Sequence, residues 1–251
     1  MIKRKSNKKV KLSILMPVKN EDKNLEIVLR LFKPLTTVPY EILVIYDNIN
    51  DNSIPVIKKI SKEYKEVKGI LNNTGSGVVN AIKCGINKSQ GEYFLITPAD
   101  EFGSIFLMPS FLACMDKYDF VNASRYIKGA GTMGDQILKH SLSYLINKLY
   151  HLFTRYNKIT DYSCGIKMFN RKVLSRIAIE SNPIGWAFAV ELSIKACIEG
   201  FKIKEIPYVS LNRLYNCKTS FSFRVWSKEY ARWFLWGIKQ SFLNKNSKRY
   251  V

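Results

Sequence analysis

Residues Gly91–Glu101 read GEYFLITPADE and combine a turn, a short strand and two acids. After the turn glycine, the apolar run Tyr93–Thr97 is too short for a helix and is typical of a strand buried on both faces. Asp100 and Glu101 follow directly, and ligands of open α/β sheets bind just beyond the carboxyl ends of strands. A carboxylate there can hold a divalent cation, which can hold a diphosphate; the alternative is an acid that caps the next helix.

Strands and helices alternate on both sides of this stretch. Leu25, Val28, Leu29 and Phe32 have the spacing of one buried helix face, and apolar runs bounded by turn residues predict the strands between such helices. The alternation predicts right-handed βαβ units and a mainly parallel sheet. The predicted strands of the first half are 12–18, 41–46, 67–71, 93–97 and 119–123.

The second half of the chain is richer in helix. Apolar residues from Ile137 to Phe153 predict one long amphipathic helix, and the last helix, 223–243, interleaves tryptophans with basic residues. This last helix either packs in the core or lies on a membrane surface. The remaining predicted elements are a polar segment at 159–169, helices around 171–179 and 186–199, and a strand at 201–209.

The composition fits one globular domain with an anionic partner. The chain has 251 residues, 47% of them apolar, and a formal net charge of +20. Nucleic acid, anionic lipid and a phosphorylated substrate all fit this charge, so it does not rank them. We expect a basic arm at 1–10, an α/β domain at 11–221, and an aromatic-rich amphipathic helix with a basic tail at 222–251.

Cysteine and hydropathy patterns predict a cytoplasmic protein that is soluble or peripheral to a membrane. The five cysteines are scattered without a CxxC pair, and there are only two histidines, so a zinc site is not expected. The apolar run Leu12–Val18 contains Pro17 and is short, which favours a strand over a signal peptide. No stretch reaches the roughly 18 apolar residues that a membrane span needs.

Polar side chains follow the predicted strands at one edge of the sheet. They are Asn20 and Glu21 after the first strand, Asp47 after the second and Asp100 after the fourth. Gly75 and Gly77 open a helix and could let the backbone approach a ligand. The pattern is not GxGxxG after the first strand, and there is no GxxxxGK[ST], so neither a dinucleotide-binding site nor a P-loop is predicted.

Several motifs together resemble a known family. PVKNE (17–21), the acid-ended second strand, GSGVVNAIKCGINKSQGEYFLI (75–96) and PADE (98–101) resemble the family 2 glycosyltransferases of the GT-A fold. Three later segments are similar, in the same order, to polyprenyl-phosphate sugar synthases of the dolichyl-phosphate mannose synthase type: SRYIKGAG (124–131), DYSCGIKMFNRKVL (161–174) and WAFAVELSIKACIEGFKIKEIPY (186–208). The resemblance covers about residues 11–221 and implies a Rossmann-like, mainly parallel sheet flanked by helices, with a C-terminal helical appendage.

The resemblance also implies roles for individual residues. Asp47 matches an acid that reads the nucleotide base, and Asp100 matches the last acid of the DxD motif, which binds Mg²⁺ or Mn²⁺. Asp100, Arg125 of the phosphate-binding region and Glu191 on a helix facing the site are the expected catalytic residues. Further donor or acceptor contacts are expected at Pro17, Asn20, Glu21, Gly75, Gly77, Arg213 and Lys218, the last two in a basic loop near the acceptor.

The sequence departs from the family pattern at two positions. Pro98 replaces the first aspartate of DxD, and Tyr46 replaces the first acid of the usual VDDGS. These departures predict fewer protein ligands for the metal and leave the identity of the donor open.

The predicted function is metal-assisted, inverting transfer of a sugar from a GDP- or UDP-sugar. The scarcity of histidine favours a polyprenyl phosphate acceptor, which is already an anion and needs cations rather than a general base. Such an enzyme would work at the inner face of an anionic membrane. The alternatives are transfer to a glycan hydroxyl, a basic nucleic-acid-binding protein that is not an enzyme, and a homologue that has lost activity.

Overall fold

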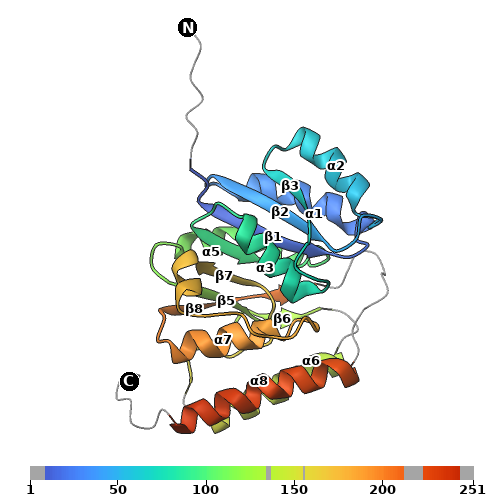
Figure 1. Ribbon diagram of the computed structural model, residues 1–251. Coiled ribbons are helices and arrows are strands. Elements are labelled where there is room, and N and C mark those ends of the chain that lie inside the picture. Colours follow the sequence, from blue (N-terminus) through green and yellow to red (C-terminus); the bar gives the residue numbers. More distant parts are fainter. Residues whose placement is uncertain (1–8, 134–136, 155, 212–222, 244–251) are drawn as a thin grey trace.

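Seven strands form one sheet in the order β3-β2-β1-β4-β7-β5-β8, and helices cover both of its faces (Figure 1). The computed structural model describes residues 9–133, 137–154, 156–211 and 223–243. All neighbouring strands are parallel except β7, which runs antiparallel between β4 and β5. The strands are β1 (Leu12–Val18), β2 (Tyr40–Tyr46), β3 (Val67–Leu71), β4 (Tyr93–Ile96), β5 (Phe120–Ser124), β7 (Lys167–Asn170) and β8 (Ile203–Pro207); β6 (Gly131–Thr132) and β9 (Val209–Ser210) form a separate pair.

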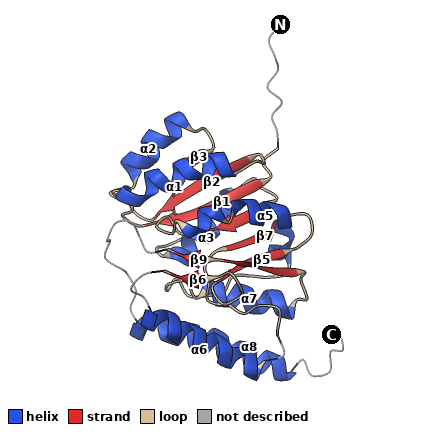
Figure 2. Cartoon of the chain, turned by 180° about the vertical axis from the view of Figure 1, so that it is seen from behind, coloured by secondary structure: helices blue, strands red, loops and turns tan. Residues whose placement is uncertain are grey.

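The helices follow the strands in the alternation that the sequence predicts (Figure 2). They are α1 (Asp22–Leu35), α2 (Ile54–Glu63), α3 (Val78–Lys88), α4 (Gly103–Phe106), α5 (Met108–Cys114), α6 (Ile137–Phe153), α7 (Phe188–Ile198) and α8 (Phe223–Leu243), with a 3-10 helix η1 at Arg171–Ser175. The predicted α/β class and the mainly parallel sheet are therefore confirmed.

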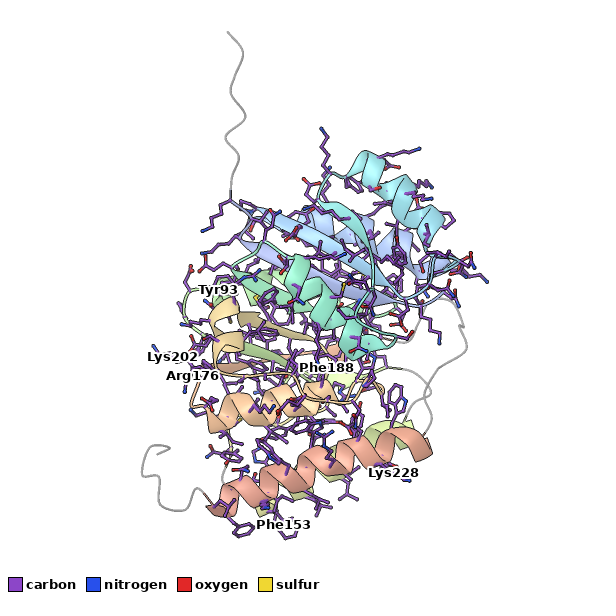
Figure 3. All side chains as sticks on the ribbon, in the orientation of Figure 1. Tyr93, Phe153, Arg176, Phe188, Lys202 and Lys228 are labelled. Carbon is purple, nitrogen blue, oxygen red and sulfur yellow. The ribbon has the colours of Figure 1, made fainter. Side chains whose placement is uncertain are left out.

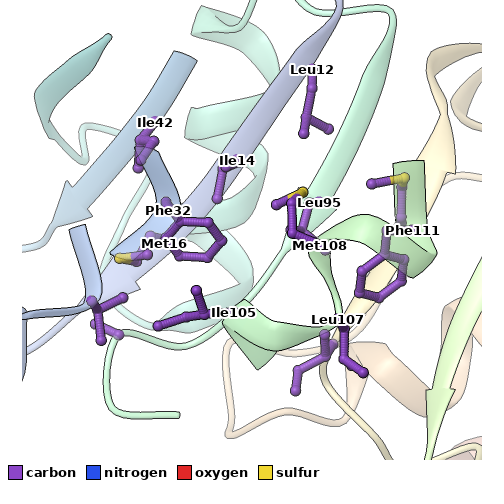
Figure 4. Packing of buried hydrophobic residues seen from close by; sticks show 14 of the residues in the cluster. Leu12, Ile14, Met16, Phe32, Ile42, Leu95, Ile105, Leu107, Met108 and Phe111 are labelled. Carbon is purple, nitrogen blue, oxygen red and sulfur yellow. The ribbon is translucent and has the colours of Figure 1, made fainter. Parts of the chain in front are cut away.

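Side chains of each central strand alternate between two apolar cores. Leu12, Ile14 and Met16 of β1 point to the core shared with Phe32 of α1, whereas Leu15 points to the opposite core. Figure 4 shows the first core, where α1, α4 and α5 close over β1, β2 and β4. Because both faces are covered, the polar carboxyl edge of the parallel strands is the place where the sheet can meet a ligand.

Strand β7 is missing from the sequence-based prediction, which treated 159–169 as a polar segment. Its residue Lys167 is buried between Asn122 and Ser193 and donates hydrogen bonds to both side chains. Buried strands are usually predicted from a continuous apolar run, and a lysine within a strand of only four residues interrupts that run.

Helix α6 has the predicted bounds, but its apolar side chains face outward. Leu145, Leu149 and Leu152 are 52%, 44% and 75% exposed, whereas the inward face carries the buried Asn147 and Tyr150. Periodicity therefore predicts the helix correctly and does not tell which face is covered. Figures 1 and 2 both show α6 beside α8, below α7 and at the edge of the molecule.

Helix α8 has apolar residues both in the core and on the outside. Trp233 is 2% exposed and packs into the core that also holds α3 and α7, which settles the core alternative for this residue. On the other side, Leu235, Phe242 and Leu243 are exposed. Figure 3 places Phe153 of α6 at the outer edge of the same helix pair. None of the helices in the described part of the chain combines the length and apolar character that a membrane span requires.

Candidate active site

Three adjacent strands place the predicted donor-binding residues along one edge of the sheet. β2, β1 and β4 are neighbours and end at Asp47, at the loop with Asn20, and at the loop with Asp100. Neighbouring strands lie about 4.8 Å apart, so the ends of β2 and β4 are about 10 Å apart. That span suits a nucleotide whose base lies near Asp47 and whose diphosphate lies near Asp100.

Asp47 organises the loop that follows β3. One carboxylate oxygen accepts a hydrogen bond from Asn72 Nδ2 at 2.7 Å, and the other accepts one from the Gly77 amide at 2.8 Å. Asn72 Nδ2 also donates to the Gly75 carbonyl at 2.6 Å. Gly75 and Gly77 have φ values of 102° and 103°, which only glycine adopts readily. The structure therefore brings these two predicted glycines together with Asp47, and Asn72 is a partner that the sequence analysis did not name.

A buried acid fixes the loop after β1. Asp51 accepts hydrogen bonds from the Asn20 amide at 3.1 Å and from the Ser53 amide at 2.8 Å. The Glu21 amide donates to Ser53 Oγ at 2.9 Å, so the two loops hold each other. Asn20 has φ 58°, a left-handed conformation that asparagine tolerates. Sequence reasoning missed Asp51, although an acid shortly after an acid-ended strand was a usable signal.

Pro17 lies in β1 opposite Ile45 and is half-buried just before this loop. Pro17 therefore lies one residue from the carboxyl end of β1, and its predicted contact with the donor stays a prediction.

The two acids after β4 differ in their surroundings. Glu101 accepts hydrogen bonds from the amides of Gly103 and Leu211 and from Ser210 Oγ, each at 3.2 Å, and burial raises its pKa. Glu101 therefore joins α4 to β9. Asp100 is half-exposed at the rim, where a ligand can reach it.

The described residues of this rim provide few protein ligands for a divalent cation, so a bound substrate would have to supply further oxygen ligands. Among the described residues, no group of three or more histidine, cysteine, aspartate or glutamate side chains is placed to hold a metal ion. Mg²⁺, however, commonly takes one or two carboxylates, phosphate oxygens of the substrate and water. A single carboxylate such as Asp100 is compatible with a cation that arrives with a diphosphate.

Arg125 follows β5 and is held by a buried acid. Its Nε and Nη2 donate to the two oxygens of Asp161 at 2.7 and 2.9 Å, and Asp161 is 0% exposed. Burial alone would raise the pKa of Asp161, but the charge of Arg125 outweighs it and lowers the pKa. Nη2 also donates to Ser163 Oγ at 3.0 Å. The guanidinium is thus fixed in place, with part of it open to solvent.

Arg125 also lines a pocket of about 360 Å³ that the sequence did not predict. The loop after β5 forms one side of the pocket, and Ser141 and Tyr144 from the start of α6 form the other. A fixed cation at the wall of such a pocket is suited to hold an anionic group of a ligand.

A buried polar network supports the segment that carries Asp161. Glu205 of β8 accepts hydrogen bonds from Asn122 Nδ2 at 3.0 Å and from the Thr160 amide at 2.9 Å. Asn122 Oδ1 in turn accepts from Lys167 Nζ, and burial lowers the pKa of Lys167 to about 8. These residues tie β5, β7 and β8 to the Asp161 segment.

Glu191 is buried and is hydrogen-bonded to protein groups. Its carboxylate is buried in α7 and accepts hydrogen bonds from the Glu180 and Ser181 amides at 2.6 and 2.8 Å and from Lys195 Nζ at 2.7 Å. This geometry fits a positioning role for the segment before α7 rather than the predicted catalytic role. Two further predicted residues, Arg213 and Lys218, lie outside the described residues.

The sheet order, the antiparallel β7 and the polar carboxyl edge define an α/β fold of the GT-A type. The chain belongs to glycosyl transferase family 2, whose profile matches residues 13–178. The family resemblance of the sequence is therefore confirmed.

Two curated relatives are similar to this chain over more than three quarters of its length. The chain is 26% identical over 204 residues to the dolichol-phosphate mannosyltransferase of Pyrococcus furiosus, covering 79% of this chain and 56% of the relative. It is 25% identical over 219 residues to the dolichyl-phosphate β-glucosyltransferase of Saccharomyces cerevisiae, covering 78% and 65%. The chain thus spans between about half and two thirds of the length of these relatives.

Solved structures share the fold. Glucosyl-3-phosphoglycerate synthase from Mycobacterium tuberculosis, in complex with Mn²⁺, UDP and glucosyl-3-phosphoglycerate, has a TM-score of 0.67 at 12% identity. The similarity covers 92% of this chain and 80% of that one. The same enzyme with Mg²⁺ and UDP has a TM-score of 0.68, also at 12% identity.

Proposed function

We propose that the protein transfers a sugar from a nucleotide-diphosphate sugar to a polyprenyl phosphate at a membrane surface. The observation that carries this proposal is the double role of α6. Ser141 and Tyr144 in its first half line the Arg125 pocket, and Leu145, Leu149 and Leu152 turn an apolar face away from the protein. A lipid phosphate needs both surfaces, a cation for its head group and an apolar phase for its chain.

The donor would lie along the edge formed by β2, β1 and β4. Asp47 and the glycine loop would meet the base, and Asp100 would bind Mg²⁺ or Mn²⁺ together with the diphosphate. The cation would stabilise the charge that develops on the departing nucleotide diphosphate. Support comes from family membership and from the neighbouring structures that contain UDP with either metal.

The acceptor would lie at Arg125, two strands beyond β4 in the sheet order. Arg125 can hold a phosphate by charge-assisted hydrogen bonds while Asp161 keeps its guanidinium in place. The attacking oxygen would be that of the phosphate itself, which is anionic and requires no base. Attack from the face opposite the leaving diphosphate gives inversion at the sugar carbon.

The membrane contact would be made by the outer faces of α6 and α8. In these two helices the sole acidic residue is Glu229, which is buried, whereas Lys148, Lys228, Arg232 and Lys239 are exposed. Apolar side chains flanked by lysine and arginine suit an anionic lipid surface, because each basic residue near it contributes about 1 kcal/mol. Such contact would make the protein peripheral at the inner face of the membrane.

The alternatives make different demands on the molecule. Transfer to a glycan hydroxyl would require a general base near the acceptor, and no carboxylate or histidine is among the lining residues of the Arg125 pocket in the described part of the chain. A nucleic-acid partner rests on net charge alone and gives no reason for an outward apolar helix face. A homologue without activity would show no turnover under any condition.

Turnover on vesicles tests the proposal. The wild-type protein would be incubated with UDP- and GDP-sugars, Mn²⁺, and anionic vesicles that carry polyprenyl phosphate, alongside the variant Leu145→Glu with Leu149→Glu. We expect transfer by the wild type and loss of both vesicle binding and transfer in the variant, with an unchanged melting temperature because both side chains are exposed. Ile49→Glu, at a more exposed apolar position outside this face, is the control for vesicle binding. Equal vesicle binding by both variants would contradict the membrane assignment.

A further inference from the structure

We infer that Glu229 of α8 is a positioning residue for the donor site, acting through the turn Ser181–Trp186. This turn, SNPIGW, connects the outward-facing helix α8 with the glycine loop that Asp47 holds. The inference rests on the proposed function in one respect, namely that the ligand at Asp47 is a nucleotide. It adds that the seating of α8 sets the affinity for that nucleotide.

Three contacts attach the turn to α8. Glu229 accepts hydrogen bonds from the Asn182 amide at 3.0 Å and from Asn182 Nδ2 at 2.8 Å. Gly185, with φ 58°, lies directly against the indole of Trp226, where a Cβ would overlap the ring. The backbone of Trp186 is hydrogen-bonded to the Tyr230 hydroxyl. Residues 226, 229 and 230 lie on one face of α8, so the helix holds the turn along its whole length.

The other side of the turn touches the donor loop. A Cβ on Gly77 would lie 2.6 Å from the Pro183 carbonyl oxygen and 3.1 Å from its Cβ, so the two backbones are in close contact. Gly77 donates its amide to Asp47, and Asp47 also binds Asn72. The order of contacts is therefore Glu229, Asn182, Pro183, Gly77 and Asp47. A displacement of α8 reaches the predicted base site through closely packed atoms.

Glu229 is buried and is held by several hydrogen bonds. It is 5% exposed, and besides Asn182 it accepts hydrogen bonds from Arg232 at 2.8 Å and Trp233 Nε1 at 3.2 Å. Burial alone would raise its pKa, but these hydrogen bonds outweigh burial and lower the pKa. Because Asn182 itself is exposed, its side chain adds little packing, and the charged partner is what fixes it.

The same turn is fixed at its start by Glu191 of α7. Glu191 accepts from the Ser181 amide and from Ser181 Oγ at 2.6 Å. The turn is thus held at one end by a core helix and along its length by α8. Glu191 fixes Ser181 to α7, whereas Glu229 ties Asn182 to α8, so the position of Asn182 depends on the position of α8.

Nucleotide binding by the intact protein tests the inference. The dissociation constants of UDP and GDP would be measured with Mn²⁺, with and without anionic vesicles, for the wild type, Glu229→Gln, Asn182→Ala and the double variant. A glutamine amide cannot accept a hydrogen bond through its nitrogen, so Glu229→Gln loses at least one of its bonds to Asn182 or Trp233. Asn182→Ala removes an exposed side chain and leaves the core intact.

We expect each single variant to raise the dissociation constant of the nucleotide roughly fivefold or more. The dissociation constant of the double variant should not exceed the larger of the two single-variant values. The donor KM should rise with kcat at saturating donor unchanged, and vesicles should tighten nucleotide binding by the wild type only. Glu41→Gln is the matched control, because Glu41 is a buried carboxylate with a backbone partner at the opposite edge of the sheet.

The possible outcomes separate the inference from the proposed function. Nucleotide binding that is normal in both single variants would overturn the positioning role while leaving the proposed function intact. An equal loss in Glu41→Gln would also overturn it, since the effect would then be one of general stability. If the wild type binds neither UDP nor GDP, the proposed function fails, and a role in nucleotide affinity fails with it.

Discussion

Arg125 and Asp161 meet through two parallel hydrogen bonds, from Nε at 2.7 Å and Nη2 at 2.9 Å, although they lie 36 residues apart. The acid is completely buried, whereas the arginine is partly open to the pocket beside α6. The pair therefore presents a cation to a ligand on a support that cannot move independently of the core.

Removal of either partner should have a large and distinguishable effect. Asp161→Asn leaves a charged guanidinium without its counter-ion and should lower the free energy of unfolding by about 3 kcal/mol or more, measured by urea titration. Arg125→Gln should in addition lower kcat/KM roughly ten- to a hundredfold through loss of the phosphate contact. Arg176→Gln, which breaks an exposed pair with Glu199, should cost less than about 1 kcal/mol. A similar small cost for Asp161→Asn would show that the buried pair is dispensable.

Asp100→Asn should abolish metal-dependent donor binding and turnover without changing the melting temperature, because Asp100 lies at the rim rather than in the core. Calorimetric titration of UDP and GDP with and without Mn²⁺, and with EDTA, would measure the effect. Asp116→Asn, an exposed acid at the opposite edge of the sheet, is the control. Activity that survives in Asp100→Asn would remove the metal assignment.

Gly77→Ala should raise the donor KM. Its φ of 103° is strained for any residue with a Cβ, and that Cβ would press against the Pro183 carbonyl. Gly131→Ala should have no such effect, because a Cβ there meets no atom within 4 Å. Steady-state kinetics with varied donor would compare the two, and identical donor KM values would place Gly77 outside the site.

Trp233→Ser should lower stability rather than membrane binding. The side chain is buried, and truncation of a buried tryptophan costs about 3 to 5 kcal/mol. Thermal unfolding should show a marked fall in melting temperature, and the protein that remains folded should bind anionic vesicles as the wild type does. Loss of vesicle binding at an unchanged melting temperature would instead place Trp233 on the lipid surface.

Stability should rise with pH between about 8 and 10.5 through Lys167. In the folded protein burial lowers its pKa to about 8, whereas in the unfolded chain it stays at 10.5. Below pH 8 both states hold the proton and the buried charge is a cost; above it the folded state releases the proton first, and stability increases. The difference of 2.5 units corresponds to about 3 kcal/mol at 1.36 kcal/mol per unit.

Urea unfolding at pH 7, 8 and 9.5 would measure this rise. Lys167→Met removes the titrating group, so the pH-dependent rise should be absent from the variant and should appear as the difference between the wild type and the variant. Parallel stability profiles for the two proteins would show that Lys167 keeps its ordinary pKa.

The sequence was sufficient for elements whose signal is local. β1 and β3 have the predicted bounds: β1 is a mainly apolar run, and β3 is a short segment closed by the turn residues Asn72 and Asn73. α6 and α8 were found by periodicity. Periodicity could not tell that the apolar face of α6 points outward, because a stripe does not reveal what covers it. The motifs around Asp47 and Asp100 predicted a candidate site at this edge, since the carboxyl ends of parallel strands meet there.

What escaped the sequence depends on partners that are distant along the chain. β7 was not predicted because it contains Lys167, whose buried ammonium group donates a hydrogen bond to Asn122, 45 residues away along the chain. Asp161 supports Arg125 through hydrogen bonds across 36 residues of the chain. Glu229 likewise accepts hydrogen bonds from Asn182, which is 47 residues away. The family resemblance also implied a catalytic Glu191, whereas its hydrogen bonds go to the backbone of the segment before α7.

The antiparallel strand β7 has a consequence for synthesis on the ribosome. β4 pairs with β1 on one side and with β7 on the other, and β5 pairs only with β7 and β8, both of which are translated later. Until residue 170 has left the exit tunnel, the apolar β4 remains an open edge that can pair with a neighbouring nascent chain. A chain released while residues 97–170 are translated is therefore expected to aggregate through this open edge.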